Sequence, residues 1–115
     1  MITDQKIGSI LAHAPVDPED GAWPHRAIRN AIEIAANSDV IRGISIECHN
    51  MRGVYSKALL EGGRQERELA GRYRKWAAAA KSEWPKTTKM LNSISDGWEE
   101  DAKREDTRAE QDKHE

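Results

Sequence analysis

Apolar residues recur at intervals of three and four along most of this chain, which is the spacing of one face of an α-helix. Near the start, Thr3 or Asp4 can cap a short helix that Pro15 stops, and the acidic stretch after this proline is typical of a loop. Pro24 suits the first turn of a second helix, which the pattern extends to about Ala36. The first part of the chain is therefore predicted to hold two short helices.

The longest regular pattern begins at Asp39. Its apolar positions are Ile41, Ile44, Cys48, Met51, Tyr55 and Ala58. Their spacing of 3, 4, 3, 4 and 3 is that of a helix-packing seam. A strand over 40–48 is the alternative, but strict alternation fails at Arg42 and Gly43, so the helix is favoured. We expect another helix to approach closely at Gly43 and at Gly53, and we expect a break at Gly53.

Two glycines, Gly62 and Gly63, are predicted to reverse the chain and to make residues 39–58 and 64–84 the two arms of a hairpin. The apolar stripe of the second arm is Leu69, Tyr73, Trp76, Ala80 and Trp84, and Pro85 ends this helix or kinks it into the next. A last stripe is carried by Thr87, Leu91, Ile94, Trp98 and Ala102. The predicted fold is all-α, a small bundle of about four to five helices around a long antiparallel helical hairpin.

The composition fits one domain with a thin core. The 115 residues include ten Ile, five Leu, three Val and no Phe, so self-association or a partner protein is expected to add stability. We divide the chain into N-terminal short helices and loop (1–37), hairpin plus third core helix (38–104), and a charged helical extension or frayed tail (105–115). One cysteine excludes an internal disulfide, and the absence of an apolar leader or membrane-length run favours a cytoplasmic protein without a membrane.

The hairpin turn gives the first candidate site. Its members are Asn50, Arg52, Tyr55, Arg64, Gln65, Glu66 and Arg67, which we call the polar interaction cluster. Arginine forks and the free N–H groups of a helix start could bind an anion or a carboxylate there. Helix capping and salt bridges between the two arms are the favoured alternative.

A basic face on the second arm is the second candidate. It consists of Arg67, Arg72, Arg74, Lys75 and Lys81. Its charge suits nucleic acid, but the chain shows no helix-turn-helix spacing, zinc-finger pattern or aromatic platform, so a solvated face is favoured. The acidic run over 96–112 could mimic nucleic-acid phosphate, although its interspersed basic residues suit a self-supporting exposed helix better.

Catalytic and metal-binding patterns are weak. No two histidines share a ligand spacing on one helix face, and neither a phosphate loop nor a nucleophile elbow is present. His13, Asp17, Asp20 and His25 are a conceivable surface metal site, but we assign no catalytic, cofactor-binding or metal-binding residue.

Residues 38–110 resemble a helical segment of uncharacterised actinobacterial proteins, some of them from mobile elements. The likeness rests on Arg52-Gly53-Val54, on Gly62 to Arg67 with its Gln-Glu-Arg ending, and on Trp84-Pro85. It implies an architecture and a bacterial or phage origin, and it transfers no activity.

The function expected from the sequence is that of a small non-enzymatic interaction module, a regulator or an inhibitor that binds another protein, with a tryptophan as its buried anchor. A homodimer is a further expectation. The alternatives are nucleic-acid binding through residues 64–89 and nucleic-acid mimicry by the acidic C-terminal helix.

Overall fold

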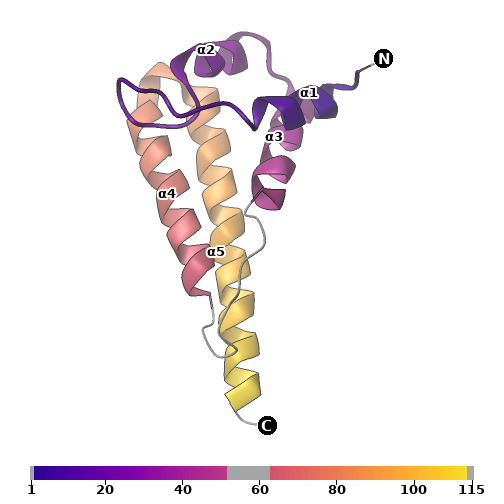
Figure 1. Cartoon of the computed structure of the whole chain (residues 1–115), viewed down its shortest axis with the longest axis vertical. Coiled ribbons are helices and arrows are strands. Elements are labelled where there is room, and N and C mark those ends of the chain that lie inside the picture. The colour runs from indigo at the N-terminus through magenta and orange to yellow at the C-terminus, as the bar shows by residue number, and fades with distance from the viewer. Residues whose placement is uncertain (1, 52–62, 114–115) are drawn as a thin grey trace.

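The computed structural model describes residues 2–51 and 63–113. In these ranges the chain forms five α-helices and no strand (Figure 1). They are α1 (Asp4–Leu11), α2 (Arg26–Ala35), α3 (Ser38–Asn50), α4 (Arg64–Ala80) and α5 (Pro85–Lys113), and the short 3-10 helix η1 (Lys81–Glu83) joins α4 to α5. The predicted all-α class is confirmed, and the strand considered for residues 40–48 is wrong because they lie within α3. No helix among the described residues has both the length and the apolar character needed to cross a membrane.

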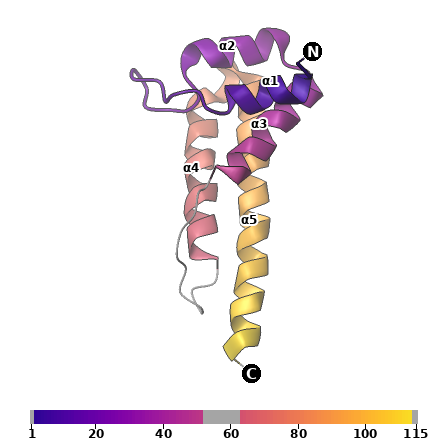
Figure 2. The same cartoon turned by 45° about the vertical axis from the view of Figure 1, so that its right-hand side comes forward.

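The long antiparallel hairpin consists of α4 and α5, which lie side by side (Figures 1 and 2). Small residues of α4 face large residues of α5 along the seam. The buried residues of α4 are Glu66, Ala70, Tyr73, Ala77 and Ala80, and those of α5 include Leu91, Ile94, Trp98 and Ala102. Because alanine lets two backbones approach, the Ser95 hydroxyl on α5 can donate a hydrogen bond of 2.8 Å to the Ala70 carbonyl on α4.

The position of this hairpin corrects the sequence-based prediction. We expected the helix after Asp39 to pack along α4 across Gly62 and Gly63, but α3 packs mainly on α1 and on α5 (Figure 2). Gly62 lies outside the described residues, as do Gly53 and the rest of the expected first arm beyond Met51. The reversal between the two long helices occurs instead at η1 and Trp84. A periodic pattern shows which face of each helix is apolar, but it does not show which faces meet.

Two glycines allow α1 and α3 to cross in close contact. A Cβ atom on Gly8 would lie 2.1 Å from the Val40 carbonyl oxygen, and one on Gly43 would lie 2.1 Å from the Gln5 carbonyl oxygen. Both distances are far below a van der Waals contact, so the expected close approach at Gly43 is confirmed, with α1 as the neighbour.

Helix α2 covers the end of the hairpin where α4 turns into α5 (Figure 1). The Glu33 carboxylate accepts hydrogen bonds from the backbone N–H groups of Lys86 (3.1 Å) and Thr87 (2.9 Å). These are orphan donors of the first turn of α5, and a negative charge is favourable there. Beside them, the Trp84 indole donates a hydrogen bond of 2.8 Å to the Asn30 side chain.

The loop between α1 and α2 is held by a fully buried arginine. Arg29 forms two hydrogen bonds with the Asp20 carboxylate (2.7 and 2.9 Å) and donates to the carbonyls of Pro24 and Ala22 (2.7 and 3.0 Å). The Arg29 guanidinium also lies 4.8 Å from the centre of the Trp84 ring. This loop is therefore fixed against the same end of the hairpin, and it carries Trp23 to the side of α4.

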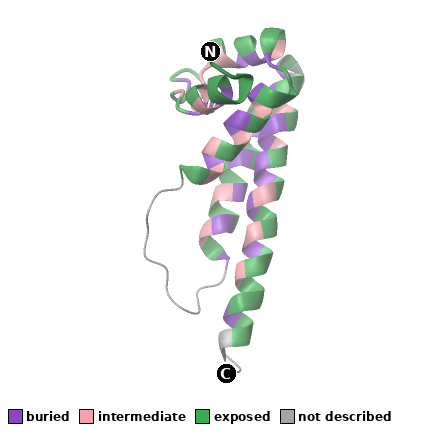
Figure 3. Ribbon diagram, turned by 90° about the vertical axis from the view of Figure 1, so that its right-hand side faces the viewer, coloured by how far each residue is buried: buried purple, intermediate pink, exposed green. Residues whose placement is uncertain are grey.

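The two hairpin helices run in opposite directions, and the C-terminal part of α5 extends in space past the point where α4 begins. This part of α5 is largely exposed (Figure 3). Only Ala109 is a buried apolar residue there. The charged extension expected after residue 104 is helical as far as Lys113.

Candidate binding pocket

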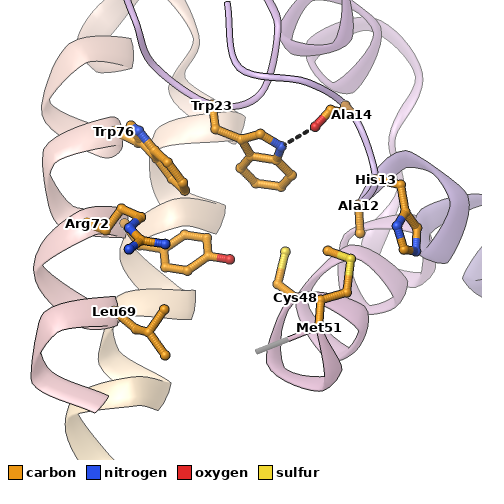
Figure 4. Close-up of a pocket in the computed structure, with 10 residues that line it drawn as sticks. Ala12, His13, Ala14, Trp23, Cys48, Met51, Leu69, Arg72 and Trp76 are labelled. Carbon is orange, nitrogen blue, oxygen red and sulfur yellow. Dashed lines mark hydrogen bonds between the residues drawn. The ribbon is translucent and has the colours of Figure 1, made fainter. Parts of the chain in front are cut away.

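A pocket of about 410 Å³ opens between the α1–α2 loop, the end of α3 and the side of α4 (Figure 4). We call it the aromatic pocket. It is lined by Ala12, His13, Ala14, Trp23, Cys48, Met51, Leu69, Arg72, Tyr73 and Trp76. The volume lies at the lower end of the range of roughly 300–1,000 Å³ that small-molecule sites occupy, so it suits one bulky side chain or a small ligand.

Three aromatic rings form its wall. The rings of Trp23 and Tyr73 meet edge to face at 6.1 Å, those of Tyr73 and Trp76 edge to face at 5.1 Å, and Trp23 lies tilted at 5.7 Å from Trp76. The Trp23 indole donates a hydrogen bond of 2.7 Å to the Ala14 carbonyl, which fixes the orientation of its ring (Figure 4). These contacts preorganise an apolar surface for another ring, since edge-to-face and offset arrangements are the favoured geometries.

The deep end of the pocket is neutral. The Tyr73 hydroxyl interacts with the Cys48 thiol, and both residues are buried. Burial raises the pKa of Cys48 to about 11, and it raises the pKa of Tyr73 as well. Both groups therefore stay protonated at neutral pH, so Cys48 lacks the thiolate that a nucleophile or a metal ligand requires.

The rim of the pocket is exposed and carries charge. Arg72 projects from α4 beside Leu69, and Met51, whose accessible fraction is 38 %, faces them from the end of α3 (Figure 4). His13 lies 2.9 Å from a Glu47 carboxylate oxygen. The pocket thus combines a rigid aromatic wall with a cationic group at its opening.

The described members of the polar interaction cluster lie at the end of α3 and in the first turn of α4. Arg52 and Tyr55 lie outside the described residues, and Asn50 is exposed at the end of α3. Arg67 faces α5, where it pairs with Asp106 (2.5 Å). The same carboxylate accepts a hydrogen bond of 2.8 Å from the Gly63 backbone N–H and raises the pKa of Arg67.

The other cluster members belong to the first turn of α4. Arg64 is exposed, Gln65 is half-buried and Glu66 is buried. His49, which precedes Asn50, stacks on Trp98 of α5 with ring centres 4.5 Å apart. The sequence left two roles open for Arg67, an anion site or a salt bridge between helices. The structure shows the salt bridge, and the partner helix is α5 instead of α3.

The basic face is partly neutralised by the acidic side of α5. Arg74 donates to Asn92 (2.8 Å) and pairs with Asp96 (2.8 Å) and Glu99 (3.3 Å), whose charges raise its pKa. With Arg67 held by Asp106, two of the five members of this face are engaged. Arg72, Lys75 and Lys81 remain exposed.

The acidic run is likewise engaged by basic residues. Asp101 pairs with Arg104, and Glu105 pairs with Arg108 at 3.7 Å, each three residues apart along α5. This is the pattern expected of a self-supporting solvated helix.

The conceivable metal site is occupied by internal hydrogen bonds. Asp17 is buried, and its carboxylate accepts hydrogen bonds from the backbone N–H groups of Glu19 and Arg26. The bond from Arg26 is the main reason that the pKa of Asp17 lies below its usual value. Asp20 is bound to Arg29, which lowers the pKa of that carboxyl further. Among the described residues, no group of histidine, cysteine and acidic side chains could hold a metal ion.

The residues of the aromatic pocket were not singled out as a site from the sequence. Leu69 and Trp76 were assigned to the core-facing stripe of their helix, yet both are only partly buried and line the pocket. The available signal was the clustering of two aromatic residues on one side of α4. Comparison of the chain with protein-family models, with curated proteins and with solved structures gives no match.

Proposed function

We propose that the protein is a small non-enzymatic interaction module that binds another protein and receives an apolar side chain of that partner in the aromatic pocket. The observation that carries this proposal is the pocket whose wall is formed by the buried rings of Trp23 and Tyr73 and the partly buried ring of Trp76, beside exposed Met51. Protein interfaces concentrate their binding energy in a few residues, rich in tryptophan and tyrosine, that line well-packed central pockets.

The chemistry of the pocket supports binding over catalysis. Cys48 and Tyr73 are held in their neutral forms, and Trp23 is fixed by its own hydrogen bond. A rigid wall keeps low the entropy lost when a partner side chain is ordered. Nucleic-acid binding through the basic face is less well supported, because Arg67 and Arg74 already bind carboxylates of α5.

Two substitutions on α3 test the proposal. Met51→Glu places a charge at the pocket, while Ile46→Glu changes a residue of similar exposure (46 % against 38 %) that does not line it. Tagged wild-type protein and both variants are used for affinity capture from the native host, after circular dichroism has shown that each variant is folded. We expect Met51→Glu to lose a captured protein that Ile46→Glu retains. The same capture by all three proteins would refute the role of the pocket.

A further inference from the structure

We infer that the partner segment bound in the aromatic pocket carries an aromatic side chain next to an aspartate or glutamate, and that Arg72 binds the acidic group. This inference rests on the proposed function and names the chemistry of the partner. It follows from the charges around the pocket.

Among the described residues that line the pocket, Arg72 is the cation that remains available. It is exposed, and within the described part of the chain it takes part in no ion pair. Glu68, one turn earlier on α4, does not engage it there. The second ionisable group at the rim, His13, already has Glu47 as its neighbour at 2.9 Å.

Two neighbouring arginines of α4 have carboxylate partners within the described residues, whereas Arg72 has none there. Arg67 and Arg74 point away from the pocket, and each is bound by carboxylates of α5. A guanidinium presents paired N–H donors that match the two oxygens of a carboxylate. Of Arg67, Arg72 and Arg74, Arg72 is the one to which the described residues supply no carboxylate, so its guanidinium is open to a carboxylate of a bound partner.

The apolar part of the pocket selects the neighbouring side chain. Trp23, Tyr73 and Trp76 already pack with mutual ring distances of 5.1 to 6.1 Å. A further ring can extend this set by edge-to-face contact, which adds to the free energy from buried area. In a partner segment with an aromatic residue next to an acidic one, the ring would pack on the aromatic wall while the carboxylate binds Arg72.

Nuclear magnetic resonance titration with defined peptides tests the inference. The probes are two hexapeptides blocked at both ends, one with tryptophan followed by aspartate and one with tryptophan followed by asparagine, together with uncharged N-acetyltryptophanamide. In the ¹⁵N-labelled protein, the indole N–H signals of Trp23 and Trp76 report on the pocket. Those of Trp84 and Trp98, which do not line it, are internal references.

We expect the aspartate peptide to bind about fivefold more tightly than the asparagine peptide, or about 1 kcal/mol, the upper range for an exposed ion pair. This ratio should fall to about one in Arg72→Gln and persist in Lys75→Gln, a matched control on the same helix outside the pocket. Both variants change exposed residues, so they should fold normally.

The outcomes separate the two proposals. If neither peptide shifts the Trp23 and Trp76 signals, the pocket is not a binding site and the proposed function fails. If both peptides bind equally, the pocket binds side chains but the role of Arg72 is wrong. Tighter binding of N-acetyltryptophanamide, which carries no carboxylate, would indicate a small-molecule site, and self-association that changes these signals without peptide would indicate a second copy as the occupant. Either result overturns the inference.

Discussion

The close crossing of α1 and α3 predicts that replacing Gly43 by alanine destabilises the protein, whereas the same replacement at an uncrowded glycine stabilises it. In Gly43→Ala, the new Cβ would lie 2.1 Å from the Gln5 carbonyl oxygen and 2.9 Å from its carbon. Carbon–oxygen contacts normally begin near 3.3 Å, so α1 has to move by about 1 Å. Since the obstacle is backbone, no side chain can rotate away.

The magnitude follows from two opposing effects. Overpacking costs about 1–3 kcal/mol, and a rigid backbone contact places this variant at the upper end. Replacing glycine by alanine inside a helix returns about 1 kcal/mol. We therefore expect Gly43→Ala to lower the free energy of unfolding by about 2 kcal/mol.

Gly71 on α4 is the matched control. A Cβ atom there meets nothing within 4 Å, so Gly71→Ala keeps only the gain in helix propensity and should stabilise by about 0.5–1 kcal/mol. Both variants are compared with wild type by urea denaturation, followed by far-ultraviolet circular dichroism. A Gly43→Ala protein that unfolds at the same or a higher urea concentration than wild type would refute the close crossing.

Four further predictions use the same measurements or a simple chemical probe. Glu33→Ala removes the two hydrogen bonds that cap α5 and should cost about 1–2 kcal/mol in urea denaturation, whereas Glu19→Ala, an exposed change, should cost little. Arg29→Met removes the hydrogen-bonded cation of Asp20, leaves it only the more distant Arg26 guanidinium at 3.7 Å, and should cost about 3 kcal/mol. Arg29 lowers the pKa of Asp20 in the folded state, so this pair stabilises the protein fully above about pH 4 and loses its effect as the pH falls below 4. In Asp20→Asn, the free energy of unfolding should therefore fall less steeply with decreasing pH than in the wild type. Burial raises the pKa of Cys48 to about 11, so a disulfide reagent at about pH 8 should modify the native thiol roughly a hundredfold more slowly than the unfolded one, and equal rates would contradict the burial.

The sequence predicted α5 and its buried face well. Thr87, Leu91, Ile94, Trp98 and Ala102 were assigned to one stripe, and all five are buried. Large apolar residues at helical spacing leave one face that can be removed from water, so the pattern alone determines this orientation.

The orientation of α4 was harder to predict because its seam is built from alanines. Ala70, Ala77 and Ala80 face α5, while Leu69 and Trp76, the stronger apolar signals, lie to the side. Close helix packing favours small side chains, and a hydrophobicity pattern gives them little weight. The predicted stripe therefore includes the buried residues Tyr73, Ala80 and Trp84, but its members Leu69 and Trp76 lie at the edge of the buried face.

The aromatic pocket could not be read from any local pattern. Trp23, Cys48 and Trp76 come from a loop and two helices, and they meet only through tertiary packing. In particular, Trp23 reaches α4 because Arg29 holds the preceding loop against the end of the hairpin. Neither of these relations has a signature in residue spacing.

The docking of α2 on the turn between α4 and α5 has a consequence for how the chain folds during synthesis. Glu33 and Thr87 are 54 residues apart, so the site that receives α2 does not exist until much later in translation. Translation adds roughly 5–20 residues per second, so Ile28 and Ile32 of α2 stay exposed for several seconds before the hairpin that buries them has been synthesised. The hairpin, by contrast, is a local structure that can form as soon as its own residues emerge. Weakening the Glu33 contact should therefore speed unfolding more than it slows folding, because this contact is made after the hairpin.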